Sequence, residues 1–522
     1  MECDSRDIRL KAFFVGAKGE NADNFKSRLD YITNRWIKWR QSFYAEEGQS
    51  VSVEDKKNEA FIAADEAIKR TLAELMTHYE KENKYFSPHY LGHMLSECSM
   101  PATLGHYVAL LHNPNNISQD ASAAGLKIER ESIDMLKDLV HYPESARGHF
   151  TSGGTVANLE AFYRAVERYR LNHGPDLSKF HVFIPRSAHY SWQKCLKIFG
   201  FSAKQVHIVD LDEEFRMDLN SLAKHIEDIG QELRGGLLVA VAGSTELGSM
   251  DLLGDILNFL NTSGLRQKIW FHVDAAYGAF FLSCEKNIRT EKWFEQLHAG
   301  VRSSDSITLD PHKLAYVPYA AGVILVRDPR DYSLYSTKAA YVDDGTDWPG
   351  ASTFEGSRPA TGATAFWLSA KSIGLNSEGY GRLLDLTLKQ KEGFQKIISS
   401  NKSIYSLRGG HTNLMNLLFK GPIEHSTEAS NQLVSRLLKC CQEGSFPYRF
   451  SKTRFDLDSY PHLKRDLLVN GFVVNSSFVD VLRIVFMNPF VASKEFKVEH
   501  LEALSFEMNR YIKHDLSHTS QA

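Results

Sequence analysis

The sequence predicts an α/β fold with a mostly parallel central sheet that helices cover on both faces. Two observations lead to this class. Between about residues 130 and 375, short β-rich runs alternate with helix-length segments, the pattern of parallel βαβ units. Some of these runs are continuously apolar, as in LLVAVAG at residues 237–243, and such runs suit strands that are buried on both sides.

The N-terminal segment, residues 1–130, is expected to be helical. Apolar residues recur with helical spacing at 21–43 and 59–82, so both stretches are expected to be amphipathic helices. Trp36 and Trp39 are among the bulky side chains available for packing there. The N-terminus carries early acids and no long apolar run, which disfavours a secretory signal.

Six β-rich runs define the expected sheet of a large domain at residues 131–380. They are HVFIP (181–185), VHIVDL (206–211), LLVAVAG (237–243), IWFHVDA (269–275), SITLD (306–310) and GVILV (322–326). After residue 380, helical patterns alternate with the strand-like runs LMNLLF (414–419) and VDVLRIVFM (479–487). These predict a small C-terminal α+β domain at residues 381–522.

Composition narrows the function classes. The chain has 522 residues, 43% of them hydrophobic and 24% charged, with a formal net charge of −3, so neither nucleic acid nor an anionic membrane is an expected partner. No apolar run reaches the roughly eighteen residues that span a bilayer. The cysteines form no CxxC pair and are expected to be free thiols in a reducing compartment, which predicts a cytoplasmic protein.

A lysine stands between the last two β-rich runs of the large domain, in the string Asp310-Pro311-His312-Lys313. A desolvated lysine becomes a nucleophile that can form a Schiff base with a carbonyl group. On this stretch alone, a surface hairpin with a solvated lysine is an equally good interpretation.

A second motif, SGGT at residues 152–155, leads directly into a helical pattern. Gly153, Gly154 and Thr155 could offer backbone N–H groups and a hydroxyl to an anion such as phosphate. A plain N-cap with flexible glycines is the alternative. The chain has no GxGxxG after the first strand and no GxxxxGK[ST], so dinucleotide and P-loop sites are disfavoured.

Three more candidates follow β-rich runs. Asp274 ends one run and could pair with a protonated heterocyclic nitrogen, while the small Ala276 would let a flat ring approach the backbone. His189 could stack on an aromatic cofactor or move a proton, and Ser244 and Thr245 could meet ring substituents. Taken singly, each of these is also explained as a cap, a core histidine or a turn.

Together these groups are the parts that a pyridoxal phosphate site needs: an anion cradle, an acid for the ring nitrogen, a stacking histidine and a lysine. No metal is predicted, because His89 and His93 share an i, i+4 spacing without an evident third ligand.

The order SGGT, AH, ST, DAAY, DPHK resembles the group II pyridoxal phosphate-dependent amino-acid decarboxylases, and most of all the bacterial tyrosine decarboxylases. The resemblance is closest over residues 85–385, and its strings are SPHYLGHMLSECSMP, HVDAAYG, DPHKLAYVPYAAG, KAAYV and FEGSRPATGATA. It implies the fold-type-I architecture of aspartate aminotransferase and pyridoxal 5′-phosphate as the cofactor.

By that resemblance, Lys313 would carry the cofactor and Asp274 would pair with its pyridine nitrogen. His189 would stack on one face of the ring and Ala276 would pack on the other. The remaining contacts would come from the phosphate-binding Gly153, Gly154 and Thr155, from His312 beside them, and from Ser244 or Thr245 near the ring hydroxyl.

The resemblance also implies residues for the substrate. Tyr341, in KAAYVDDGTDWPG, would protonate the substrate Cα after CO₂ leaves, and His93 would line the substrate pocket. Ser357, in the EGS string at 355–357, would reach the site of a neighbouring subunit, so a homodimer with shared active sites is expected.

The predicted reaction is therefore decarboxylation of an L-amino acid, aromatic by preference, as in tyrosine to tyramine. One alternative is an acidic substrate, aspartate or glutamate, which would need a cation such as Arg358 or Arg483 in the side-chain pocket. A carbon–carbon lyase of the sphingosine-phosphate type and a catalytically silent scaffold are the other two alternatives.

Overall fold

The structure is a computed structural model that describes residues 5–44, 46–286, 290–337, 352–421 and 425–519. Its large sheet has seven strands in the order β1-β7-β6-β5-β4-β2-β3. Their bounds are β1 Arg147–Thr151, β2 Phe180–Pro185, β3 Val206–Val209, β4 Gly235–Val241, β5 Ile269–Asp274, β6 Ser306–Leu309 and β7 Gly322–Val326. All six β-rich runs of the large domain therefore form strands, and β1 is an addition to them.

The large sheet is mostly parallel, as predicted. The pairs β2–β3, β2–β4, β4–β5 and β5–β6 are parallel, whereas β7 is antiparallel to both of its neighbours. Because β6 and β7 are adjacent and antiparallel, the chain from residue 310 to 321 returns across the same edge of the sheet. The lysine motif lies in this return.

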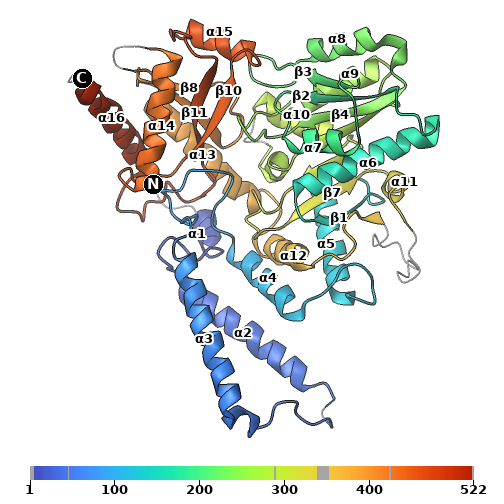
Figure 1. The fold of residues 1–522 in the computed structure, drawn as a ribbon, viewed down its shortest axis with the longest axis vertical. Coiled ribbons are helices and arrows are strands. Elements are labelled where there is room, and N and C mark those ends of the chain that lie inside the picture. Colours follow the sequence, from blue (N-terminus) through green and yellow to red (C-terminus); the bar gives the residue numbers. More distant parts are fainter. Residues whose placement is uncertain (1–4, 45, 287–289, 338–351, 422–424, 520–522) are drawn as a thin grey trace.

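Helices cover both faces of the large sheet (Figure 1). They are α4 Met100–His112, α5 Ala123–Leu139, α6 Gly154–His173, α7 Ser191–Ile198, α8 Leu219–Ile229, α9 Leu253–Thr262, α10 Lys292–Val301, α11 Pro329–Ser333 and α12 Thr361–Ile373. Successive residues of β4 point to opposite cores: Leu237 packs with α6 and α7, and Leu238 packs with α9, α10 and α12. Two-sided burial explains why this strand is continuously apolar.

The C-terminal part contains an antiparallel four-stranded sheet in the order β10-β11-β9-β8. Its strands are β8 Ile404–Ser406, β9 Leu414–Phe419, β10 Ser451–Asp456 and β11 Phe478–Val485, and its helices are α13 Tyr380–Ile398, α14 Thr427–Glu443, α15 Pro461–Val469 and α16 His500–Thr519. The small α+β architecture is as predicted. The domain boundaries at 130 and 380 stay predictions.

The N-terminal helices differ from the rest of the fold. α1 (Ser5–Lys11) packs on the body, where Arg9 donates to the carbonyl oxygen of Ile373 at 2.8 Å. By contrast α2 (Ala22–Gln41) and α3 (Glu59–Tyr79) project from the body (Figure 1), and neither contains a buried residue. Among the described residues, none of the helices combines the length and the apolar character needed to cross a bilayer.

Candidate active site

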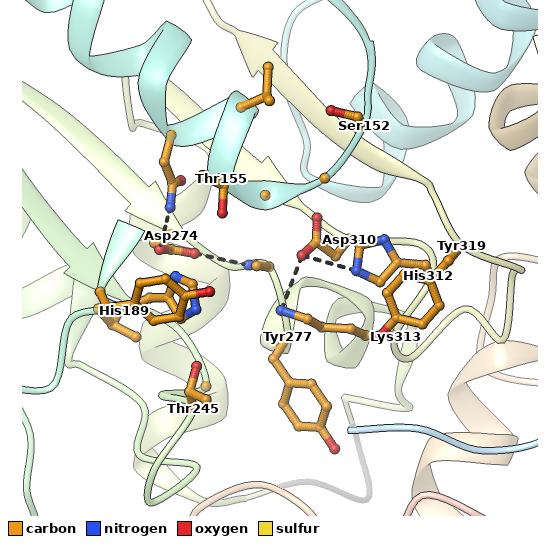
Figure 2. A pocket seen from close by; sticks show the side chains of 18 of the residues that line it. Ser152, Thr155, His189, Thr245, Asp274, Tyr277, Asp310, His312, Lys313 and Tyr319 are labelled. Carbon is orange, nitrogen blue, oxygen red and sulfur yellow. Dashed lines mark hydrogen bonds and ion pairs between the residues drawn. The ribbon is translucent and has the colours of Figure 1, made fainter. Parts of the chain in front are cut away.

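A cavity of about 410 Å³ opens where β4, β5 and β6 end and α6 begins. Nine of the residues predicted for the site line it: Gly153, Gly154, Thr155, His189, Thr245, Asp274, Ala276, His312 and Lys313. Figure 2 shows the labelled ones among them (Thr155, His189, Thr245, Asp274, His312 and Lys313) around one space, from separate elements. In a parallel sheet the carboxyl ends of neighbouring strands share one edge, and this brings residues distant in sequence together.

Four predicted residues are not part of this lining. Ser244 is buried in its own loop, where its hydroxyl lies 2.7 Å from that of Ser249. Ser357 accepts a hydrogen bond from Asn115 at 3.0 Å, and His93 is exposed with a left-handed φ of 44°. Tyr341 lies outside the described residues.

The anion cradle forms at the first turn of α6. Gly153 is the N-cap residue and provides no capping side chain, so Gly154 and Thr155 begin the helix without an intrahelical acceptor for their N–H groups. Gly153 has a φ of 150°, a conformation that L side chains rarely adopt. A Cβ on Gly154 would lie 2.8 Å from Asp310 Oδ2, so this close approach requires glycine.

Asp274, at the end of β5, is fixed by two donors. Asn158 Nδ2 and Trp192 Nε1 donate to its Oδ2 at 2.8 Å and 2.9 Å. Asn158 in turn accepts from the hydroxyl of Thr308 on β6 at 2.8 Å. Within the described ranges, the second oxygen, Oδ1, accepts one hydrogen bond, from the backbone N–H of Ala276 at 3.4 Å, and so has room for a ligand in the cavity that Asp274 lines. This arrangement suits a fixed acceptor for a protonated ring nitrogen.

Sequence reasoning missed Asn158 and Trp192, although both had a signal. Asn158 lies four residues after Gly154, one helical turn further along α6, so it faces the same side as the cradle. Trp192 lies three residues after His189, in the first turn of α7. Both side chains donate to the carboxylate of Asp274 at the end of β5.

His189 has a defined orientation at the start of α7. Its Nδ1 accepts the backbone N–H of Ser191 at 3.3 Å and lies 2.9 Å from the Ser191 hydroxyl. Burial lowers the pKa of His189, and the charge of Lys313 acts in the same direction against the opposing charge of Asp274. The imidazole is therefore favoured in its neutral form, which suits stacking on a flat ring.

The lysine end of the cavity contains a cluster of charges. Lys313 Nζ lies 3.1 Å from Asp310 Oδ2, and His312 Nε2 lies 3.5 Å from the same oxygen. The ring of Tyr319 lies against that of His312, with centroids 4.2 Å apart and the ring planes tilted by 33°. Lys313 is therefore mostly buried and paired, which contradicts the interpretation as a solvated hairpin lysine.

The two candidate cations for an acidic substrate have different surroundings. Arg358 pairs with Glu129 at 2.5 Å, and its two terminal nitrogens also donate to main-chain carbonyl oxygens. Arg483, on β11, is 6% exposed and forms no ion pair within the described part of the chain. The positive charge of Arg483 opposes the rise that burial causes in the pKa of Tyr277, a residue that lines the cavity. The same charge is the second cause, after desolvation, of the lowered pKa of His93.

The geometry of the cavity suits pyridoxal phosphate. A helix N-terminus with open N–H groups faces the cavity, Asp274 presents one free oxygen to it, and Lys313 enters from the opposite side (Figure 2). Added Cβ atoms would obstruct the cradle at Gly154. The cavity thus offers an anion site, an acceptor and an amine to one flat ligand.

Comparison with known proteins agrees with a pyridoxal phosphate site. The family described as "Pyridoxal-dependent decarboxylase conserved domain" matches residues 45–420. An L-tyrosine decarboxylase of Enterococcus faecium is 26% identical over 527 residues, 83% of this chain and 85% of the relative. An L-aspartate/L-glutamate decarboxylase of Pyrococcus horikoshii is 29% identical over 356 residues, 67% of this chain and 85% of the relative.

A solved structure shares the fold. Oryza sativa TDC, with PLP and tryptamine, superposes with a TM-score of 0.71 at 16% identity, covering 95% of this chain and 98% of that one. Because the family match spans most of the sequence, the chain belongs to the pyridoxal-dependent decarboxylases, carboxy-lyases that use pyridoxal 5′-phosphate to decarboxylate amino acids.

Proposed function

We propose that this enzyme decarboxylates an aromatic L-amino acid, with tyrosine as the first candidate, and releases CO₂ and the amine. The observation that carries the reaction class is the convergence of Asp274, His189 and Lys313 with the start of α6 around one cavity. The similarity to the Enterococcus faecium L-tyrosine decarboxylase supports the choice of substrate.

Each predicted residue has a role in this proposal. Lys313 would bind the cofactor through Nζ and release it to the substrate amine, and Asp274 would keep the ring nitrogen protonated through its free oxygen. His189 and Ala276 would hold the two faces of the ring. The phosphate and ring-hydroxyl contacts would come from Gly153, Gly154, Thr155, His312, Ser244 and Thr245.

When bound, pyridoxal phosphate withdraws the electron pair that the departing carboxyl group leaves on the substrate Cα. The chain contributes orientation and charge. The fixed Asp274 requires no reorganisation at the moment of reaction, because Asn158 and Trp192 already hold it. Tyr341 would then donate a proton to Cα as a general acid, and His93 would line the substrate pocket.

A homodimer is part of the same proposal. α2 and α3 contain no buried residue in one chain, yet they carry large exposed apolar side chains such as Trp39, Ile68 and Leu72. An apolar surface of this kind indicates an interface with another chain. We propose a second copy as that chain, with Ser357 reaching the partner's site. A cytoplasmic location, supported by the free thiols of the described cysteines, completes the proposal.

A second candidate function is decarboxylation of an acidic amino acid. Arg483 favours it, because this buried guanidinium forms no ion pair in the described part of the chain and feels the charge of Glu246 only at longer range, so it would gain from a substrate carboxylate. The Pyrococcus horikoshii relative, an L-aspartate/L-glutamate decarboxylase, belongs to the same family. The two candidates differ only in the side chain that the pocket accepts.

The deciding experiment is CO₂ release from a panel of L-amino acids by the purified enzyme with added cofactor. Turnover of tyrosine above aspartate and glutamate is the expected result, and the reverse order would favour the second candidate. Absence of turnover with every aromatic and acidic amino acid would refute the proposal. In the same assay Tyr341→Phe should depress amine formation, and light scattering should give twice the chain mass.

A further inference from the structure

A second acid stands at the lysine end of the cavity. Asp310 is the first residue after β6 and is 3% exposed. Figure 2 shows its carboxylate between Lys313 and the start of α6, with dashed contacts to Lys313 and His312. These are the ion pairs of 3.1 Å and 3.5 Å, and both use Oδ2.

The other oxygen of Asp310, Oδ1, is fully buried and has no hydrogen-bond partner among the residues that the structure describes, although Asp310 is part of the cavity lining. The ideal Cβ position of Gly154 lies 3.1 Å from Oδ1, so the carboxylate rests against the first turn of α6. The positive end of that helix and the ammonium of Lys313 are the two favourable charges near it.

Asp274 and Asp310 therefore differ in what holds them. Asp274 is held by N–H groups of Asn158 and Trp192, which keep their protons throughout a reaction. Asp310 is held by an amine and an imidazole, which can both change charge. Its interaction energy must therefore change whenever Lys313 becomes neutral.

We propose that Asp310 is a positioning residue that holds the Lys313 ammonium whenever the amine is not bonded to the cofactor. In this role it sets the pH range in which the lysine captures pyridoxal phosphate. The inference rests on the proposed function, since it takes Lys313 as the residue that binds the cofactor.

The capture step balances as follows. The Lys313 ammonium leaves Asp310 and gives one proton to solvent. The lone pair of the neutral amine forms a bond to the aldehyde carbon of pyridoxal phosphate. The aldehyde oxygen leaves as water with the two remaining amine hydrogens, and a carbon–nitrogen double bond results.

Among the described residues, the other titratable groups that line this cavity include Tyr190, Tyr277 and the four that follow. His312 lies on the same loop and Tyr319 further along it, while His189 follows β2 and Asp274 ends β5. Burial lowers the pKa of both His189 and His312, so each is favoured as neutral. Burial raises the pKa of Tyr319, which is therefore neutral as well. Asp310 is thus the acid in contact with the ammonium.

The test compares cofactor capture by the wild-type apoenzyme and by Asp310→Asn, which keeps the shape and loses the charge. Stopped-flow absorbance gives the capture rate from about pH 6 to about pH 10. Borohydride reduction and mass measurement of the Lys313 peptide confirm the bond. The midpoint of the rate profile should fall by about one pH unit or more in the variant, so capture below the wild-type midpoint becomes about tenfold faster.

Asp458→Asn is the matched control, since it makes the same change in an Asp–Lys pair outside the site, where Lys464 Nζ lies 3.2 Å from Asp458 Oδ1; its midpoint should match the wild type. Asp310→Ser is a second charge-removing variant in case Asp310→Asn does not fold, and it should shift the midpoint in the same direction. Equal midpoints in wild type and a folded variant would overturn the inference. Failure of the proposed function would look different: the wild type would capture no cofactor at any pH.

Discussion

Two buried arginines, Arg358 and Arg483, differ in the partners of their guanidinium groups. Arg358 is 3% exposed, pairs with Glu129 at 2.5 Å, and donates to the carbonyl oxygens of Phe150 and Asn116 at 3.0 Å each. Arg483 is 6% exposed, and its one hydrogen bond to a side chain reaches the hydroxyl of Ser451 at 3.4 Å. In both arginines Nε has no acceptor among the described residues. The two therefore differ in whether an acid forms an ion pair with the guanidinium, as Glu129 does with Arg358.

The pKa directions express that difference. Burial lowers the pKa of a guanidinium in both places. At Arg358 the charge of Glu129 and its hydrogen bond outweigh burial and raise the pKa, whereas at Arg483 burial prevails and the pKa is lowered. Removing one member of a buried ion pair is costly, because it leaves the other charge uncompensated, whereas a buried cation that forms no ion pair would gain from an anionic ligand. Sequence alone did not separate these two candidates.

The largest expected effect is on folding, from Arg358→Met. The variant leaves the Glu129 carboxylate buried without its cation and removes two donors from main-chain carbonyls. Breaking a buried ion pair from one side costs about 3–5 kcal/mol. The free energy of unfolding, measured with urea, should fall by that amount.

The double variant Arg358→Met, Glu129→Met is the control for this prediction. Replacing both charges with apolar side chains removes the uncompensated carboxylate, so the double variant should recover part of the lost stability. A single variant as stable as the wild type would show that the pair does not support the fold, and the contrast with Arg483 would disappear.

A smaller effect, on catalysis instead of folding, is expected from Arg483→Met. The free energy of unfolding should stay the same or rise, because a buried charge without an acid is removed. Loss of a charged hydrogen bond to a substrate carboxylate costs about 2–3 kcal/mol, which corresponds to a fall in kcat/KM of roughly 30- to 150-fold. Loss with every substrate would indicate the α-carboxylate, and loss with acidic substrates alone would indicate the side chain.

A destabilised Arg483→Met enzyme with unchanged kcat/KM would reverse the assignment. Arg483 would then be the structural arginine of the two. Arg358→Met gives the matched comparison, since its remaining folded fraction should keep the wild-type kcat/KM.

The contrast also shows how far the sequence leads. Asp274 and Lys313 could be predicted, because they lie at or shortly after the ends of predicted strands, and strand ends of one parallel sheet meet at one edge. The SGGT cradle was predicted from its glycines and the helical pattern after them, although the strand before it, β1, was not. Six of the seven strands of the large sheet were predictable from β-rich, largely apolar runs, and β1 was not. These are local patterns combined by one simple topological rule.

Other features depend on contacts that no local pattern encodes. Arg358 meets Glu129 across 229 positions of sequence, and Arg483 approaches Tyr277 only because the small sheet packs beside the large one. Strand β10 has an alternating, mostly polar sequence and escaped prediction. The unpaired buried oxygen of Asp310 can be identified only from the three-dimensional arrangement of the residues described around it.

The smallest expected effect is a change in the pKa of His93. This residue is exposed, yet partial desolvation of its ring lowers its pKa first, and the charge of Arg483 lowers it further. Arg483→Met removes the nearby positive charge, so the His93 pKa should rise toward its ordinary value, whereas Arg358→Met should leave it unchanged. Histidine-selective NMR titration, with His93→Gln to assign the signal, measures both. Because a lowered pKa means that the folded state resists protonation, stability is lost as the pH falls below the ordinary histidine value, and this loss should shrink in Arg483→Met. Equal shifts in the two arginine variants would show that neither charge acts on the substrate side of the cavity selectively.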